Sequence, residues 1–156
     1  MDASVTKVIR VCHRCDLVRR PCFKILGIMD TTNDILIIDD DPIMREALAE
    51  LLEDEGYGVR KAADGSAGLA AVRYAAPALV ITDIHMPETN GAMVIAKLKE
   101  QYPDVPVIAI SGLFNCGHGM DADTAIALGA ARALGKPFKC AELLRAVSDV
   151  LGSRAG

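Results

Sequence analysis

The stretch A-L-V-I-T-D-I-H-M-P, residues 78–87, constrains the fold of this chain more than any other. Ala78 to Ile81 form a continuous apolar run, which is typical of a strand buried on both faces of a parallel sheet. The run ends at Asp83, and Pro87 then prevents the ladder from continuing. Open α/β sheets bind ligands at the carboxyl ends of their strands. The sequence therefore predicts a functional carboxylate, Asp83, at the tip of a central strand.

From residue 34 onward, short apolar runs alternate with amphipathic segments. We expect strands at 35–38, 57–63, 78–83, 105–110 and 130–134, and helices at 42–55, 64–74, 91–100, 121–128 and 138–151. Asp41 and Pro42 mark one helix start, because Asp is a good N-cap and Pro fits the first helical position. Five strands alternating with five helices predict an α/β fold with a doubly wound, five-stranded parallel sheet. Right-handed crossovers then put helices on both faces.

The composition favours one globular domain with an aliphatic core. The chain has 156 residues, of which 51% are hydrophobic, with no Trp and only 4% aromatic residues. No apolar run approaches the roughly 18 residues that a membrane helix needs. Five cysteines is an odd number, and the start of the chain lacks the unbroken apolar segment of a secretory signal. We therefore expect reduced thiols and a cytoplasmic protein without membrane contact.

Residues 1–33 differ from the rest of the chain in charge and pattern. Residues 1–28 carry six Lys and Arg against two Asp, whereas the remainder carries eleven basic and nineteen acidic residues. The acidic body has no basic patch of the kind that binds nucleic acid. We predict a basic N-terminal extension that is flexible or non-native, a domain at 34–151 and a short tail at 152–156.

The extension also holds a group of cysteines, Cys12, Cys15 and Cys22, with His13 between the first two. Closed structural zinc sites usually need four ligands in a paired arrangement, which this group does not provide. Incidental thiols are therefore the favoured interpretation.

Reactive polar residues follow four of the five predicted strands: Asp39 and Asp40, Asp83, Ser111, and Lys136. The carboxyl ends of parallel strands share one edge of the sheet, so these residues can form a single site. Several carboxylates at close range repel one another, so either some are protonated or a cation lies among them. Mg²⁺ prefers carboxylates together with water and phosphate oxygens. We predict that Asp83 attacks phosphorus in line, while Mg²⁺ and Lys136 hold the equatorial oxygens and the Ser111 hydroxyl donates to an oxygen of the attached group.

Four motifs carry a resemblance to a known family: I-L-I-I-D-D-D-P at 35–42, T-D-I-H-M-P at 82–87, V-I-A-I-S-G at 107–112 and L-G-K-P-F at 134–138. Each is weak alone, but all four occur in order and at compatible spacing. The chain resembles the CheY-like receiver domain of two-component response regulators. The resemblance implies a flavodoxin-like sheet with strand order 2-1-3-4-5.

The resemblance also implies a phosphoacceptor and its metal ligands. Asp83 would take a phosphoryl group from a sensor histidine kinase or a histidine phosphotransfer protein. Mg²⁺ would be bound by Asp39, Asp40, Asp83 and the backbone carbonyl of His85.

The remaining positions of the resemblance surround the expected phosphoryl group. Lys136 would pair with it, Ser111 and Gly112 would form the phosphate-binding and switch segment, and Lys136–Pro137 would be a cis peptide bond. The downstream protein partner stays open.

The sequence departs from the family at the switch aromatic. Receivers usually place Tyr or Phe three residues before the conserved Lys, where this chain has Ala133. Alanine has no rotamer to switch, so we expect the Gly-rich loop 113–120 and the following helix to be the responsive surface. The face of helix 4, strand 5 and helix 5 is a possible homodimer surface.

One enzyme alternative is a haloacid-dehalogenase-type phosphatase, whose first strand ends in D-x-D. Asp39 to Asp41 match this loosely, but Pro42 and Met44 fit poorly after such a motif and no acidic pair follows Lys136. There is also no insertion large enough for a cap. In that alternative Asp39 would be phosphorylated instead of Asp83.

A second alternative is a pseudo-receiver that binds partners without phosphorylation. The complete set of acids, Ser and Lys disfavours it. We therefore expect a phosphoacceptor signalling domain that is not an enzyme beyond its own phosphorylation and dephosphorylation.

Overall fold

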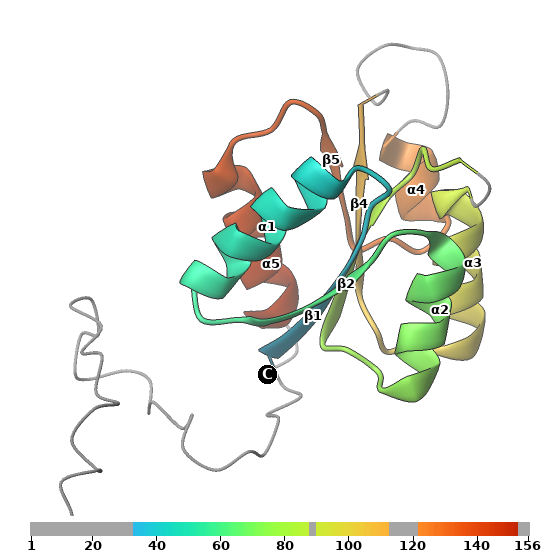
Figure 1. The fold of residues 1–156 in the computed structure, drawn as a ribbon. Helices are drawn as coiled ribbons and strands as arrows, with labels where there is room; N and C mark the ends of the chain where they lie inside the picture. The colour runs from blue at the N-terminus through green and yellow to red at the C-terminus, as the bar shows by residue number, and fades with distance from the viewer. Residues whose placement is uncertain (1–32, 88–89, 113–121, 153–156) are drawn as a thin grey trace, which may run out of the picture.

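The computed structural model describes residues 33–87, 90–112 and 122–152, in which strands and helices alternate along the chain (Figure 1). The strands are β1 (Asp34–Ile38), β2 (Gly58–Ala62), β3 (Leu79–Asp83), β4 (Val107–Ser111) and β5 (Arg132–Gly135). The helices are α1 (Pro42–Asp54), α2 (Gly65–Tyr74), α3 (Gly91–Gln101), α4 (Ala122–Ala127) and α5 (Cys140–Gly152). Cys12, Cys15, Cys22 and the loop 113–120 lie outside the described residues.

The strands form one parallel sheet in the order β2-β1-β3-β4-β5, which confirms the predicted fold class. β3 lies at the centre, paired with β1 on one side and β4 on the other. All five residues of β3 are buried, as are all five of β4. Both strands begin with apolar residues, and β3 then ends in the polar pair Thr82 and Asp83, whereas β4 ends in Ser111.

Helices cover both faces of the sheet. α1 and α5 lie on one face, and α2, α3 and α4 lie on the other (Figure 1). Alternate residues of each strand supply two separate cores. Ile35 and Ile37 pack with helix residues such as Leu52 and Val147 on the α1/α5 side. On the opposite side, Leu36 and Ile38 pack with the helix residues Val72, Val94 and Leu98.

Local sequence signals place the helix that follows β1. The Asp41 side chain accepts hydrogen bonds from the backbone N–H groups of Ile43 and Met44, and Pro42 is the first helical residue. α1 ends at a Glu55 C-cap, and Gly56 follows with a φ of +89°, a conformation that glycine adopts without a Cβ penalty. These observations confirm the predicted start and end of this helix.

The last strand and helix begin two residues later than the sequence predicts. Gly129 has a φ of +108°, and the N–H of Ala130 still donates to the Ala125 carbonyl of α4, so the chain turns before β5 starts. The Glu142 carboxylate accepts a hydrogen bond from the Lys139 backbone N–H at 2.9 Å. The Glu142 N–H donates in turn to the Lys139 carbonyl at 2.9 Å, and this pair of hydrogen bonds starts α5 at Cys140.

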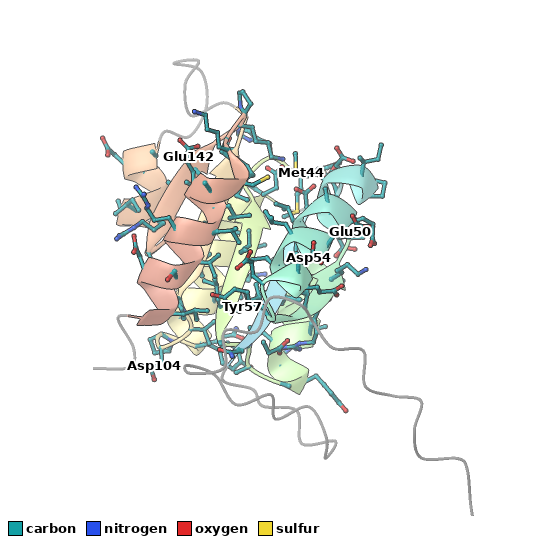
Figure 2. All side chains as sticks on the ribbon, turned by 90° about the vertical axis from the view of Figure 1, so that its left-hand side faces the viewer. Met44, Glu50, Asp54, Tyr57, Asp104 and Glu142 are labelled. Atoms are coloured by element: carbon teal, nitrogen blue, oxygen red, sulfur yellow. The ribbon has the colours of Figure 1, made fainter. Side chains whose placement is uncertain are left out.

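Figure 2 views the α1/α5 face, with Met44 and Glu142 towards one end and Asp104 at the other. The first end is the carboxyl edge of the sheet, where the strands finish. None of the described helices is both long and apolar enough to cross a membrane.

Candidate functional site

Three carboxylates meet at the carboxyl edge of the sheet. Asp39 and Asp40 follow β1, and Asp83 is the last residue of β3, the neighbouring strand. One oxygen from each lies within 4.8 Å of the others. Asp39 and Asp83 are buried, at 1% and 8% exposure, whereas Asp40 is exposed. The parallel topology thus brings together the acids that the sequence predicts to share a site.

Lys136, directly after β5, reaches across to this acid cluster. Its Nζ atom lies 2.6 Å from Oδ2 of Asp83 and 3.5 Å from Oδ2 of Asp39. Burial lowers the pKa of Lys136, but the hydrogen bond and charge of Asp83, together with Asp39, outweigh burial and raise that pKa. Lys136 therefore stays protonated and offsets part of the negative charge of the cluster.

Backbone N–H groups fix the orientation of the two buried carboxylates. Oδ1 of Asp39 accepts from the Asp41 N–H at 2.8 Å, and Oδ1 of Asp83 accepts from the His85 N–H at 2.8 Å. Both bonds leave the Oδ2 atoms directed at Lys136. Burial, helped by the charge of Asp83, raises the pKa of Asp39 despite the Asp41 and Lys136 contacts. A cation among these oxygens would relieve that repulsion.

Two residues near the acids were not singled out by the sequence reasoning. Arg45 of α1 donates a hydrogen bond from NH1 to the backbone carbonyl of Asp39 at 2.6 Å. Gly91, the first residue of α3, donates its N–H to the Ile84 carbonyl at 2.9 Å, and a Cβ there would collide with the Asp83 carbonyl oxygen. Glycine at the start of a helix after a functional strand is a signal for close backbone approach, whereas nothing in the sequence marks Arg45.

The other predicted positions flank the acid cluster. Ser111 ends β4 with a fully buried side chain, and its carbonyl accepts from the Lys136 N–H at 2.8 Å, while Gly112 is exposed. The Lys136–Pro137 peptide bond is cis, as the resemblance implies. The backbone of His85 contacts Asp83, but its imidazole is exposed.

Ala133 occupies the position where receivers usually have the switch aromatic. It is half-buried in β5, pairs in register with Ala109 of β4, and packs against the core on the α2/α3/α4 side. Two alanines side by side on neighbouring strands leave this part of the sheet with small side chains.

The donor set fits a small hard cation. It consists of carboxylate oxygens from Asp39, Asp40 and Asp83, and oxygen ligands of this type suit Mg²⁺. The exposed Asp40 leaves one side of the cluster open to water, and Mg²⁺ usually keeps several water ligands. No other group of three or more potential metal-ligating His, Cys, Asp or Glu side chains gathers in the described parts of the chain.

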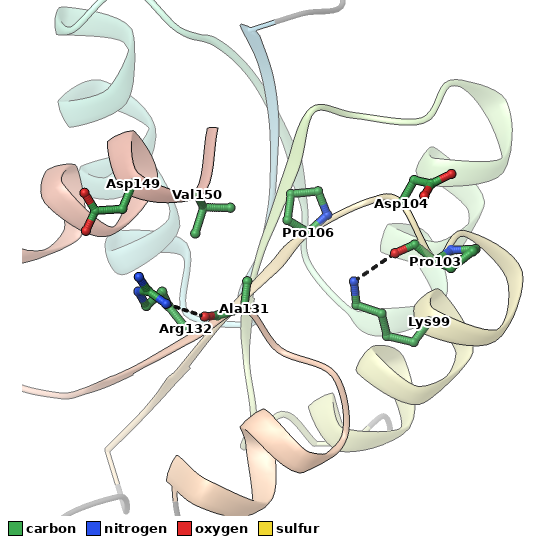
Figure 3. Close-up of a pocket in the computed structure, with 8 residues that line it drawn as sticks. All are labelled: Lys99, Pro103, Asp104, Pro106, Ala131, Arg132, Asp149 and Val150. Atoms are coloured by element: carbon green, nitrogen blue, oxygen red, sulfur yellow. Dashed lines mark hydrogen bonds between the residues drawn. The ribbon is translucent and has the colours of Figure 1, made fainter. Parts of the chain in front are cut away.

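A surface hollow of about 400 Å³ lies at the opposite edge of the sheet (Figure 3). Its lining includes Lys99, Pro106, Arg132 and Asp149, with both signs of charge. It shares no residue with the acid cluster, so the predicted chemistry does not involve it.

Comparison with known proteins agrees with this geometry. The model of the response regulator receiver domain family matches residues 35–148. The nitrogen assimilation regulatory protein NtrX of Azorhizobium caulinodans is 37% identical over 117 residues, which cover 72% of this chain and 24% of that protein. The chain spans less than half the length of the first curated relatives it matches.

Solved structures show the same relationship. The receiver domain of NtrX from Brucella abortus superposes with a TM-score of 0.71 at 36% identity, covering 76% of this chain and 98% of that one. The CheX–CheY–BeF3–Mg²⁺ complex from Borrelia burgdorferi gives a TM-score of 0.68 at 27% identity, covering 75% and 87%.

The fold and the acid–lysine cluster define the class as a flavodoxin-like α/β domain with a polar site at the carboxyl edge of its sheet. More narrowly, the chain belongs to the response regulator receiver domain family of two-component systems. These findings do not favour the dehalogenase-type or the pseudo-receiver alternative.

Proposed function

We propose that Asp83 accepts a phosphoryl group from a phosphohistidine of a sensor histidine kinase or a histidine phosphotransfer protein. One observation carries this proposal: Oδ2 of Asp83 lies 2.6 Å from the Lys136 ammonium inside a cluster of three carboxylates. This arrangement combines the Asp83 nucleophile, the Lys136 ammonium and a set of carboxylate oxygens suited to a metal ion. The ammonium can pair with the negative charge of the phosphoryl oxygens.

The transfer is an in-line displacement at phosphorus. An oxygen of Asp83 forms the new P–O bond while the P–N bond of the phosphohistidine breaks, and the imidazole keeps the electron pair and later takes a proton. The His85 N–H holds Oδ1, which leaves Oδ2 as the attacking atom. Lys136 already contacts Oδ2, so its ammonium can shift to the phosphoryl oxygens as charge moves onto them.

Asp39, Asp40, Asp83 and the backbone carbonyl of His85 would hold Mg²⁺. When bound, the ion neutralises charge on the phosphoryl oxygens. Asp39 is the weaker nucleophile candidate, because it is almost fully buried and its Oδ2 lies 3.5 Å from the Lys136 ammonium, against 2.6 Å for Oδ2 of Asp83. This contrast favours Asp83 over Asp39 as the acceptor.

The test is labelling of the full chain with acetyl phosphate in the presence and absence of Mg²⁺, read by intact mass and peptide mapping. We expect one added phosphoryl group, on Asp83, that requires Mg²⁺. Asp83→Asn should abolish the label, and Asp104→Asn, at an exposed acid on the opposite edge, should keep it. Label on Asp39, or none on the intact protein, contradicts the proposal.

The phosphorylated acid changes the charge of the carboxyl edge, and signalling follows if partners distinguish the two states. Ser111 would contact the phosphoryl group only after a local shift, because its side chain is fully buried. Without an aromatic at Ala133, we propose that the loop 113–120, outside the described residues, and α4 respond instead. Hydrogen exchange with and without beryllofluoride tests this, and unchanged protection of α4 and the loop contradicts it.

The domain in this proposal is a phosphoacceptor rather than an enzyme, with no chemistry beyond gaining and losing its own phosphoryl group. Kinases that form phosphohistidine draw on cytoplasmic ATP, so we place the transfer in the cytoplasm. The proposed boundaries are a receiver at 34–151 with an N-terminal extension and a short C-terminal tail.

Self-association is proposed at the face of α4, β5 and α5. Ile126 of α4 is 44% exposed, an apolar side chain suited to such a contact. Sedimentation of the beryllofluoride-treated protein should show dimers that Ile126→Glu weakens, and a monomer in both forms contradicts the idea.

A further inference from the structure

Arg45 holds the backbone of the buried acid Asp39 from outside the acid cluster. It lies in the first turn of α1, and its side chain points back over the turn that carries the two acids after β1. Its NH1 donates to the Asp39 carbonyl at 2.6 Å, in a partly buried contact across six positions of the chain. A charged donor makes this a stronger bond than one between neutral groups.

A cation in the first helical turn is placed against the helix dipole, whose positive end lies there. No carboxylate of the described residues lies within 4.0 Å of the Arg45 guanidinium, so an ion pair does not compensate it. The presence of Arg45 in this turn is therefore best explained by its hydrogen bond to the Asp39 carbonyl.

Besides the 3.5 Å contact from Lys136 to its Oδ2, three hydrogen bonds fix Asp39, and their partners are Ala62, Asp41 and Arg45. Its N–H donates to Ala62 of β2 at 3.2 Å, its Oδ1 accepts from the Asp41 N–H at 2.8 Å, and its carbonyl accepts from Arg45 at 2.6 Å. The first two orient the N–H and the carboxylate. Among the described residues, the third is the hydrogen bond that fixes the peptide plane joining Asp39 to Asp40, and thereby the direction in which the exposed Asp40 leaves β1.

We propose that Arg45 is a positioning residue, which keeps Asp39 and Asp40 gathered with Asp83 and so sets the affinity for a divalent cation. This inference rests on the proposed function. Arg45 touches no reacting atom and acts through the Asp39–Asp40 peptide. It holds the carboxylates in place, as hydrogen-bonding partners behind metal ligands commonly do.

Charge and geometry predict opposite signs for removal of Arg45. If the guanidinium acted only as a nearby positive charge, its loss would strengthen the attraction of the carboxylates for Mg²⁺. If it acts by holding the peptide, its loss weakens Mg²⁺ binding, because Asp40 must then be ordered when the ion binds. The sign of the change therefore separates the two roles.

The experiment measures Mg²⁺ affinity of the full chain by calorimetric titration, repeated with Mn²⁺ by electron paramagnetic resonance. Arg45→Met keeps an apolar stem and removes the donor and the charge, and we expect about 10-fold weaker binding or more. Arg45→Lys restores a charged donor and should recover much of the affinity. Arg73→Met is the control, at an exposed arginine in the last turn of α2, and should bind as the wild type does.

Urea unfolding of each variant without metal separates positioning from folding. A merely structural role lowers the free energy of unfolding and leaves the dissociation constant of the folded protein unchanged, which overturns the inference. Equal or tighter Mg²⁺ binding by Arg45→Met overturns it as well, while the proposed function stands if the wild type binds Mg²⁺ and is labelled at Asp83. A wild type that binds no Mg²⁺ overturns both.

Discussion

Replacing Gly91 by alanine should impair the phosphoacceptor more than it impairs the fold. Gly91 starts α3 against the end of β3, and its N–H bonds the Ile84 carbonyl at 2.9 Å. A Cβ at this position would overlap the Asp83 carbonyl oxygen and lie 2.6 Å from Cα of Ile84. These neighbours are backbone atoms, so they cannot rotate away as a side chain does.

The size of the effect follows from that contact. Carbon atoms pack at about 3.5–4.0 Å, so α3 and the Asp83–Ile84 backbone must separate by about 1 Å. Overpacking of this kind lowers the free energy of unfolding by about 1–3 kcal/mol. Alanine offsets up to about 1 kcal/mol of this loss, because it reduces the conformational entropy of the unfolded chain. A 1 Å misplacement of a reacting group can lower a rate about 100-fold. We therefore expect a loss of about 1–2 kcal/mol in unfolding free energy and a far larger loss in phosphorylation rate.

The assay follows the initial rate of acetyl phosphate labelling and the urea unfolding of the same samples. Gly68→Ala is the matched control, because a Cβ there meets side-chain atoms of Ile38, including Cγ1 at 2.8 Å, and not backbone. This control should lose stability but keep most of its phosphorylation rate. A Gly91→Ala protein that is labelled at the wild-type rate, or two variants with equal losses of rate, would refute the reasoning.

Three further predictions concern the cations of the fold. Lys136→Met should lose acetyl phosphate labelling and about 2–3 kcal/mol of unfolding free energy, because two buried acids lose their partner; intact labelling would rule out its role. Folding raises the pKa of Lys136, so the stability that this lysine gives the folded protein is complete below lysine's ordinary pKa of about 10.4 and is lost as pH rises through the higher folded value. In urea titrations at alkaline pH, the wild type should therefore lose more stability than Lys136→Met. Parallel curves for the two proteins would contradict this. Arg60→Met should lower the free energy of unfolding in urea by about 2 kcal/mol without slowing labelling. The Arg60 guanidinium binds Asp34 and two carbonyls near the end of α2, and solvent partly screens these contacts. An unchanged unfolding midpoint would show that the contacts contribute nothing.

The sequence predicts the structure correctly where that structure depends on residues close together in the chain. Apolar runs fixed β3 and β4 because both faces of these strands are buried, and Asp41 with Pro42 marked the start of α1. The acids and Lys136 could be assigned to one edge because parallel strands all finish there. Their contacts at 2.6 Å and 3.5 Å then follow from the topology rather than from any single motif.

The sequence was insufficient where one long side chain or one close approach decides the geometry. Arg60 and Asp34 are 26 positions apart, and an arginine on an exposed edge strand resembles any solvated cation. Arg45 looks like an ordinary helix residue until its guanidinium is seen on the Asp39 carbonyl. The late start of β5 depends on the positive φ of Gly129. The apolar residues that follow Gly129 instead predict a strand that begins directly after it.

The two outer strands of the sheet, β2 and β5, bear on how the protein avoids aggregation. Their outer backbone groups could template pairing with another chain, but each strand is short and presents an exposed cation, Arg132 on β5 and, on β2, Lys61, which also pairs with Glu46 of α1. Like charges brought together by strand addition repel, so neither edge invites a sixth strand. Molecules crowded together during synthesis would therefore contact one another through helices and loops. Amyloid-like stacking, which needs unprotected sheet edges, is disfavoured.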